Sequence, residues 1–315
     1  MSEKKAHQEI TAKLRAECKR LLETGTVHTV IGFAPGSMPD RTVPVFITNP
    51  QEVAQLTWNP FCAANLSKYL LDHHQPGGKA AIVVKGCDSR GIVRLLQDNQ
   101  VLRDEVHILG IPCRGQYDHR KIPAGLDVRA TEPPEQETAD VAHPELRLEK
   151  CAYCENPTPV IYDLLLDDAV APSTDSSGRF TEITDLEAKT AQEKSAYWDD
   201  HFSRCLRCYA CRNACPACTC RECVFDQFDP DWVSKRNNLT ENTAFHLIRA
   251  FHVAGRCVDC GECDRVCPVQ IPLRLLNRKI IKDLDELFEA PTPGTDINVK
   301  PALGDFTPQD PDEFH

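Results

Sequence analysis

The sequence has no apolar run that approaches the roughly 18 consecutive residues of a membrane-spanning helix. Its start, MSEKKAHQEI, also lacks the apolar stretch of a secretory signal peptide. We therefore expect a cytoplasmic protein with no direct membrane insertion, in which any link to a membrane would run through another subunit.

Positive charge is also scarce, since 36 Lys and Arg face 47 Asp and Glu for a net charge of -11. Nucleic-acid binders normally carry a basic patch that meets phosphates, so we expect no nucleic-acid partner. No Ser-His-Asp set or metal-hydrolase helix motif is apparent. No catalytic residue is therefore assigned, and whether the chain is itself an enzyme stays open.

Cysteine, by contrast, is abundant, with 17 residues in a chain of 315. In a small secreted protein such a number would indicate disulfides, but this chain is large, shows no sign of export and has an odd cysteine count. Clustered free thiols in a reducing compartment usually bind metal. The length also exceeds what one hydrophobic core usually supports, which predicts at least two domains.

The first half of the chain alternates short apolar runs with helical patterns. The predicted order is an amphipathic helix at 4–24, strands at 27–33 and 43–47, a helix at 61–71, a buried strand at 80–84, a helical pattern at 92–96 and a strand at 106–109. Strand, helix and strand in this order predict an α/β unit with a parallel-type sheet.

Two cysteine motifs with identical spacing lie in the last third of the chain. Cys205 to Pro216 and Cys257 to Pro268 both match C-x₂-C-x₂-C-x₃-C-P, the pattern of bacterial dicluster ferredoxins. In that pattern three thiolates bind one 4Fe-4S cluster and the fourth reaches the other cluster. This crossing assigns Cys205, Cys208, Cys211 and Cys267 to one cluster, and Cys257, Cys260, Cys263 and Cys215 to the second.

Zinc is the alternative for these motifs, but zinc sites more typically pair two C-x₂-C units without the third cysteine and the trailing Cys-Pro. Three further cysteines, Cys218, Cys220 and Cys223, exceed what two clusters need. They could be structural thiols, an incomplete site or alternative ligands, and the structural interpretation is favoured. Arg207, Arg212 and Lys85 could offset the charge of reduced clusters, but solvation at the surface is the favoured interpretation.

The remaining helical patterns surround these motifs and set the expected division of the chain. A polar helix is predicted at 183–202, a helix at 244–254 and a third after Pro272. The expected parts are an N-terminal helix at 1–26, an α/β domain at 27–166 that includes an irregular stretch at 117–149, a linker and helix at 167–200, a mainly helical dicluster ferredoxin domain at 201–290 and an extended tail at 291–315.

Four cysteines of the N-terminal half could form another site. Cys87 and Cys113 each follow a predicted strand, so a parallel sheet would place both at its C-terminal edge, where open α/β folds bind ligands. Cys151 and Cys154 add a C-x₂-C pair. A third 4Fe-4S cluster is one interpretation, while isolated cysteines in the core are the other. Cys62 is interpreted as packing.

The segment around Cys87 also suits a phosphate. Lys85, Gly86, Ser89 and Arg90 open a helix after a buried strand, and a helix N-terminus favours phosphate or pyrophosphate. The segment is not G-x-G-x-x-G, so it predicts no ordinary dinucleotide fold. A helix capped by Asp and Ser is the alternative, and it is preferred from these residues alone.

These segments together resemble the beta subunits of deazaflavin-reducing hydrogenases and related formate dehydrogenases. The resemblance is closest to the formate dehydrogenase type and its bacterial relatives associated with heterodisulfide reductase-like proteins. It is carried by VVKGCDSRGIV (83–93), GIPCRG (110–115), CAYC (151–154), CLRCYACRNACPACTCREC (205–223) and FHVAGRCVDCGECDRVCPVQIPL (251–273).

The resemblance implies an α/β flavin domain that holds FAD beside a proximal 4Fe-4S cluster ligated by Cys87, Cys113, Cys151 and Cys154. The dicluster module would then carry electrons to a partner formate dehydrogenase, hydrogenase or heterodisulfide reductase-like subunit. Some family members carry this module at the N-terminus, whereas here it is C-terminal. No motif independently establishes FAD, so a flavin-free 4Fe-4S relay and docking subunit is the alternative function.

Overall fold

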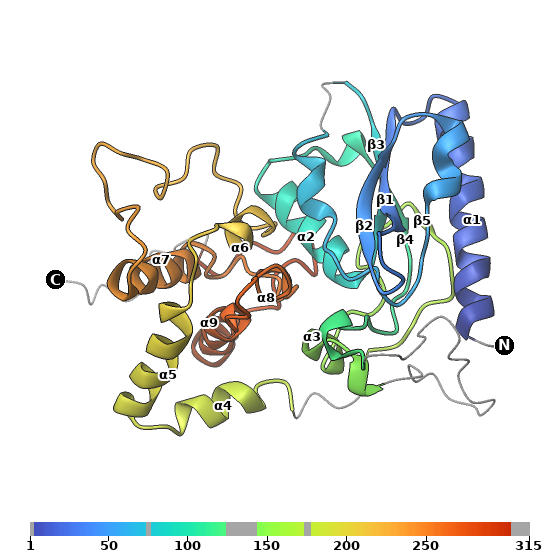
Figure 1. The fold of residues 1–315 in the computed structure, drawn as a ribbon. Helices are drawn as coiled ribbons and strands as arrows, with labels where there is room; N and C mark the ends of the chain where they lie inside the picture. Colours follow the sequence, from blue (N-terminus) through green and yellow to red (C-terminus); the bar gives the residue numbers. More distant parts are fainter. Residues whose placement is uncertain (1–2, 74–76, 124–143, 173–177, 304–315) are drawn as a thin grey trace. The chain divides into compact units, whose positions relative to one another are not determined.

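The computed structural model describes residues 3–73, 77–123, 144–172 and 178–303. The chain forms two compact units, Met1–Arg179 and Phe180–His315, which are described separately (Figure 1). The predicted irregular stretch at 117–149, the linker and the tail from 291 all extend partly outside the described residues. Within the described residues, no helix has the length and apolar character that crossing a membrane requires.

The first unit contains a five-stranded sheet in the order β2-β1-β3-β4-β5. Its strands are β1 (Thr29–Pro35), β2 (Thr42–Ile47), β3 (Ala80–Val84), β4 (Val106–Gly110) and β5 (Leu164–Leu165). The neighbours from β1 to β5 pair in parallel, while β2 pairs with β1 in antiparallel. The sheet is therefore mixed and not parallel throughout, because the short connection 36–41 permits a hairpin but no crossover.

Helices cover both faces of this sheet. Figure 1 shows α1 (Glu3–Glu23) and α2 (Gly86–Gln97) on opposite sides of it. The apolar stripe of α1 includes Leu14, Cys18 and Leu21, which are fully buried in the core that the sheet strands share. Shorter elements complete the unit: η1 (Pro50–Gln55), η2 (Ser67–Leu70), η3 (Arg103–Glu105), η4 (His119–Lys121), η5 (Pro144–Leu146) and α3 (Glu149–Ala152).

The helix predicted at 61–71 is wrong, since only the 3₁₀ turn η2 forms there. The Asn65 side chain accepts hydrogen bonds from the backbone N–H (3.0 Å) and hydroxyl of Ser67, and the N–H of Leu66 donates to the Asp88 carboxylate at 2.8 Å. These side-chain acceptors replace the backbone carbonyls that a helix would use.

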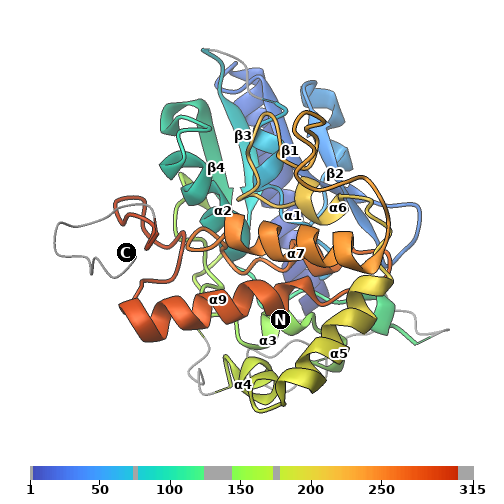
Figure 2. The ribbon, with the colours of Figure 1, turned by 90° about the vertical axis from the view of Figure 1, so that its left-hand side faces the viewer.

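The second unit is mainly helical, as expected, and its described residues contain no strand. Its helices are α4 (Thr181–Glu187), α5 (Ala191–Ser203), α6 (Ala210–Asn213), α7 (Leu239–His252), α8 (Glu262–Arg265) and α9 (Leu273–Phe288). Figure 2 shows α7 and α9 side by side, with α5 against α7.

Two helix boundaries in this unit differ from the prediction. The helix expected at 183–202 is divided into α4 and α5, because Thr190 starts a new helix through a capping box with Glu193. Helix α7 begins earlier than expected, at Leu239, where the Asn238 side chain accepts a hydrogen bond from the N–H of Glu241.

Truncation of Leu14 tests the packing of α1. We expect Leu14→Ala to lower the free energy of unfolding by about 2–5 kcal/mol, because the side chain is fully buried and its loss leaves a cavity. The matched control is Leu102→Ala, whose side chain is 56% exposed, with an expected change within about 0.5 kcal/mol. Chemical unfolding measures both, and equal losses in the two variants would contradict the packing.

Candidate functional site

The two cysteine motifs of the second unit follow the same backbone course. Arg207 and Tyr209 have φ of 53° and 58°, and Asp259 and Gly261, at the equivalent positions, have 53° and 68°. Such angles are uncommon for residues other than glycine. Each motif therefore repeats an unusual loop, which turns into the short helix that carries its third cysteine, α6 or α8.

This loop directs backbone N–H groups toward the thiols. The N–H of Arg207 donates to Cys205 Sγ at 3.4 Å, and the N–H of Asp259 donates to the Cys257 thiol. Beyond the second motif, the N–H of Ile271 donates to the sulfur of the fourth cysteine at 3.3 Å. Backbone donors that converge in this way stabilise negative charge on sulfur.

The structure brings the thiols together in two groups of four. Burial raises the pKa of Cys211 to about 11, and the neighbouring charges of Cys205, Cys267 and Cys208 act in the same direction. The fourth cysteine of the second motif thus lies with the first three cysteines of the first motif. Which four thiolates bind each cluster stays a prediction.

The second group has the reciprocal composition. Burial raises the pKa of Cys257 to about 12, to which Asp259 and Cys215 contribute. Burial also raises the pKa of Cys263, which lies beside Asp264 as well as Cys257 and Cys260. Within the described residues, no three His, Cys, Asp or Glu side chains form a group suited to a single metal ion. Four thiolates suit a 4Fe-4S cluster, where each binds a different iron.

A third group of thiols lies in the first unit, at the C-terminal edge of its parallel strands. Cys87 follows β3 and Cys113 follows β4, and these strands are parallel neighbours. Burial raises the pKa of Cys154 to about 12, with contributions from Cys87, Cys151 and Cys113. The structure therefore brings together all four cysteines that the sequence places in this site.

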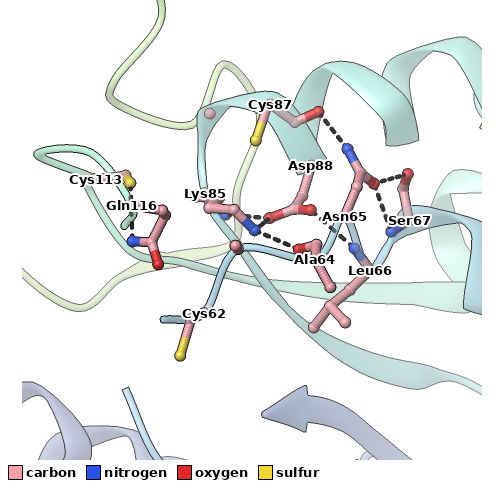
Figure 3. A network of polar contacts seen from close by, with 12 residues as sticks. Cys62, Ala64, Asn65, Leu66, Ser67, Lys85, Cys87, Asp88, Cys113 and Gln116 are labelled. Atoms are coloured by element: carbon pink, nitrogen blue, oxygen red, sulfur yellow. Dashed lines mark hydrogen bonds and ion pairs between the residues drawn. The ribbon is translucent and has the colours of Figure 1, made fainter. Parts of the chain in front are cut away.

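Gln116 contacts this group and has no sequence signal of its own. Its Nε2 donates to Cys113 Sγ at 3.3 Å, as Figure 3 shows, while its Oε1 is buried without a hydrogen-bond partner among the described atoms. A neutral donor to sulfur is one of the means by which proteins tune an iron–sulfur cluster.

Lys85 is a buried cation close to the same group of thiols. Its Nζ donates to Asp88 Oδ2 at 2.8 Å and to the carbonyl of Ala64 at 2.6 Å (Figure 3). Burial acts against the charge, but Asp88, Cys87 and Cys113 raise the pKa of Lys85, so the ammonium stays protonated.

The N-terminus of α2, predicted to face a phosphate, is covered by residues 156–160. A Cβ on Gly86 would lie 1.6 Å from the Asn156 carbonyl oxygen. Ser89 Oγ donates to the Gly86 carbonyl at 2.8 Å and accepts from the N–H of Val160 at 2.9 Å. Arg90 is buried. Contacts between a cofactor and these residues stay a prediction.

The cysteines outside the three groups do not share one environment. Cys62 is fully buried in the core of the first unit. Cys218 packs beside Cys215, Cys223 accepts a hydrogen bond from Arg212, and Cys220 is exposed. No common site follows from their positions.

Arginine near the first motif is less exposed than the sequence suggests. Arg207 is buried, and its guanidinium donates to the carbonyls of Glu241 (2.8 Å) and Ser234 (3.0 Å). Arg212 is half-buried and pairs with Asp226 at 2.9 Å. The expectation of solvated surface charges is wrong for Lys85, which is buried beside Asp88. It is also wrong for Arg207, because Tyr209 and Phe245 cover its guanidinium with aromatic rings.

Replacement of Asp88 tests the ion pair beneath the N-terminal thiols. We expect Asp88→Asn to lower the free energy of unfolding by about 3–5 kcal/mol, because it leaves the buried charge of Lys85 without its carboxylate. The control is Glu23→Gln, which removes the exposed pair with Lys19 and should cost less than about 1 kcal/mol. Chemical unfolding at neutral pH measures both, and a loss in Asp88→Asn no larger than the control's would contradict this role.

Comparisons with known proteins match the two cysteine motifs and most of the rest of the chain. The model of the 4Fe-4S dicluster domain matches residues 201–271. The F420-dependent formate dehydrogenase subunit beta of Methanocaldococcus jannaschii is 25% identical, with coverage of 91% of this chain and 94% of that protein. The F420-dependent formate dehydrogenase 1 subunit beta of Methanococcus maripaludis is 24% identical, with coverage of 92% of each.

A solved structure also matches part of the chain. A chain of the F420-reducing [NiFe] hydrogenase complex from Methanosarcina barkeri covers 36% of this chain and 43% of its own length, with 19% identity and a TM-score of 0.29. That overlap is too small to support a conclusion about the fold. The two sequence relatives confirm the resemblance: over most of its length the chain is similar to beta subunits of F420-dependent formate dehydrogenases, and its second unit contains a 4Fe-4S dicluster domain.

Proposed function

We propose that this chain is the iron–sulfur subunit of a multi-subunit oxidoreductase and passes electrons between a flavin or soluble carrier and a partner subunit. The observation that carries the proposal is the pair of crossed thiol groups in the unit that matches the dicluster model. Cys205, Cys208, Cys211 and Cys267 hold one 4Fe-4S cluster, and Cys257, Cys260, Cys263 and Cys215 hold the other.

A bound 4Fe-4S cluster supplies one-electron exchange at a potential that its surroundings set. The chain's own contribution is to bury the thiolates and direct donors at sulfur. The N–H groups of Arg207 and Ile271 do this for the first cluster, at 3.4 and 3.3 Å from Cys205 and Cys267. Such hydrogen bonds favour the more negative reduced state.

Cys87, Cys113, Cys151 and Cys154 hold a third 4Fe-4S cluster in this proposal. Support comes from their convergence at one sheet edge, although they are distant in sequence. The Gln116 amide donates to Cys113, and Lys85 provides a charge nearby. Electrons that enter the N-terminal unit would reach this cluster first.

FAD next to that cluster would complete the transfer. The two relatives are named for dependence on F420, a deazaflavin, and a deazaflavin passes two electrons as hydride, whereas a cluster accepts one. A flavin, if bound next to the cluster, would supply exchange of two electrons with the carrier and of one electron with the cluster. The partner is a formate dehydrogenase, hydrogenase or heterodisulfide reductase-like subunit.

One observation favours a second function, that of a flavin-free relay and docking subunit. Lys85, Gly86 and Ser89, the residues predicted to contact a phosphate, have partners within the chain itself. In this alternative the first unit serves to bind the partner enzyme, and electrons pass only through the clusters.

Composition of the anaerobically purified protein tests the proposal. We expect about twelve irons and twelve sulfides per chain, because each of three cubanes holds four of each, whereas eight would mean that the N-terminal group binds no cluster. Flavin in the visible spectrum or after acid release supports the leading function. An intact complex without flavin supports the relay, and a colourless protein with stoichiometric zinc would exclude both.

Single cysteine substitutions test whether the fourth cysteine of each motif binds the cluster of the other motif. Cys260→Ser and Cys215→Ser should remove the same electron paramagnetic resonance signal from the reduced protein, because their thiols belong to one group. Cys208→Ser and Cys267→Ser should remove the other signal. Cys220→Ser, which changes an exposed thiol outside both groups, is the control. An unchanged spectrum and iron content in Cys260→Ser would contradict the assignment.

A further inference from the structure

Arg249 is a buried cation on α7 for which the described residues offer no carboxylate partner. Its side chain is 3% exposed, and Nη2 donates to the backbone carbonyl of Cys211 at 2.9 Å. Its Nε is buried with no hydrogen-bond partner among the described atoms. A backbone carbonyl satisfies one N–H group but does not balance the charge.

Arg249 differs from most buried cations among the described residues, which pair with carboxylates. Lys85, Arg94 and Arg274 each pair with a carboxylate, at 2.8, 2.5 and 2.6 Å. Arg207 donates to two carbonyls and lies over the Phe245 ring. Since an isolated buried charge is costly, a counter-charge for Arg249 must come from another kind of group.

The thiols of both cluster groups act on Arg249, and as deprotonated ligands of bound clusters they would supply that negative charge. Burial acts against the charge of the guanidinium, but Cys215, Cys263, Cys211 and Cys218 raise its pKa. Cys211 belongs to the first group and lies on α6, while Cys215 and Cys263 belong to the second. Arg249 contacts the first group through the carbonyl of Cys211, and α6 and α8, which carry Cys211 and Cys263, pack against each other.

His246, one turn before Arg249 on α7, does not change this balance. Burial and the charges of Arg249 and Arg207 lower its pKa to about 3, so the ring is neutral near pH 7. Both ring nitrogens are buried without a hydrogen-bond partner among the described atoms, and the ring stacks on Phe202. Arg249 thus remains the cation that the two groups share.

We infer that Arg249 is the shared counter-charge of the two cluster sites and holds the reduction potentials of both clusters above the values that a neutral side chain would give. The inference rests on the proposed function, because it requires a cluster in each group. Reduction adds one electron to a cluster and makes it more negative. A fixed nearby cation therefore stabilises the reduced state more than the oxidised one, and burial protects this attraction from screening by salt.

Redox titration monitored by electron paramagnetic resonance tests the role of Arg249 in the loaded protein. In Arg249→Gln and Arg249→Met, the midpoint potentials of both clusters should shift in the negative direction. Arg249→Lys keeps the charge, so its potentials should lie between those of the wild type and Arg249→Gln. Arg236→Gln removes an exposed arginine from the same unit and should leave both potentials unchanged.

If Arg249 is a shared counter-charge, its substitution must shift the midpoint potentials of both clusters. The shift must also depend on the charge of the side chain at position 249. Wild-type potentials in loaded Arg249→Gln, a shift of only one cluster, or equal shifts in Arg249→Lys and Arg249→Gln would each overturn it. Loss of clusters in both neutral variants with full loading of Arg249→Lys supports it, whereas loss in all three overturns it. A wild-type chain without iron would remove the proposed function itself.

Discussion

Buried thiolates are unfavourable unless positive charge or hydrogen-bond donors compensate them, and this requirement governs both units of the protein. Burial raises the pKa of Cys154 to about 12, of Cys211 to about 11 and of Cys257 to about 12. With no cationic ligand these thiols would keep their protons at neutral pH. An iron–sulfur cluster in these groups, as proposed, would bring positive iron and release protons when it binds.

The two units compensate their buried thiols in different ways. In the first unit the cation near the thiols is already neutralised, because Lys85 pairs with Asp88 at 2.8 Å, and Gln116 adds a neutral donor. In the second unit Arg249 has no carboxylate among the described residues, so its charge acts on the thiol groups themselves. The cysteine loops add hydrogen-bond donors, because their residues with positive φ turn backbone N–H groups toward sulfur.

Much of this arrangement could be predicted from the sequence, because the features concerned are local. The motif spacing predicts which cysteines gather. Apolar periodicity predicts α1 close to its observed bounds, the second half of α2 and the start of α9. The antiparallel edge strand and the irregular course of 61–71 escape such prediction for physical reasons. A hairpin fixes the direction of β2, and the helix at 61–71 is displaced by side-chain acceptors, one of which lies 22 residues away at Asp88.

The residues around the thiols are harder to predict, since their roles depend on tertiary contacts. Arg249 lies 38 residues from its hydrogen-bond partner Cys211, and nothing in the pattern of α7 distinguishes it from a surface arginine. Gln116 is likewise an ordinary polar residue in the sequence. Only the fold shows that both are buried, that Gln116 donates to Cys113 Sγ and that Arg249 donates to the carbonyl of Cys211.

The reciprocal composition of the two thiol groups also bears on synthesis and maturation. A nascent chain that ends before Cys257 presents the first motif, yet its fourth cysteine lies with thiols that have not been made. Cys211 and its neighbours likewise await Cys267. With the proposed ligand sets, neither set of four is complete until translation has reached the second motif, so neither cluster could bind all four of its thiolates before both motifs have been synthesised.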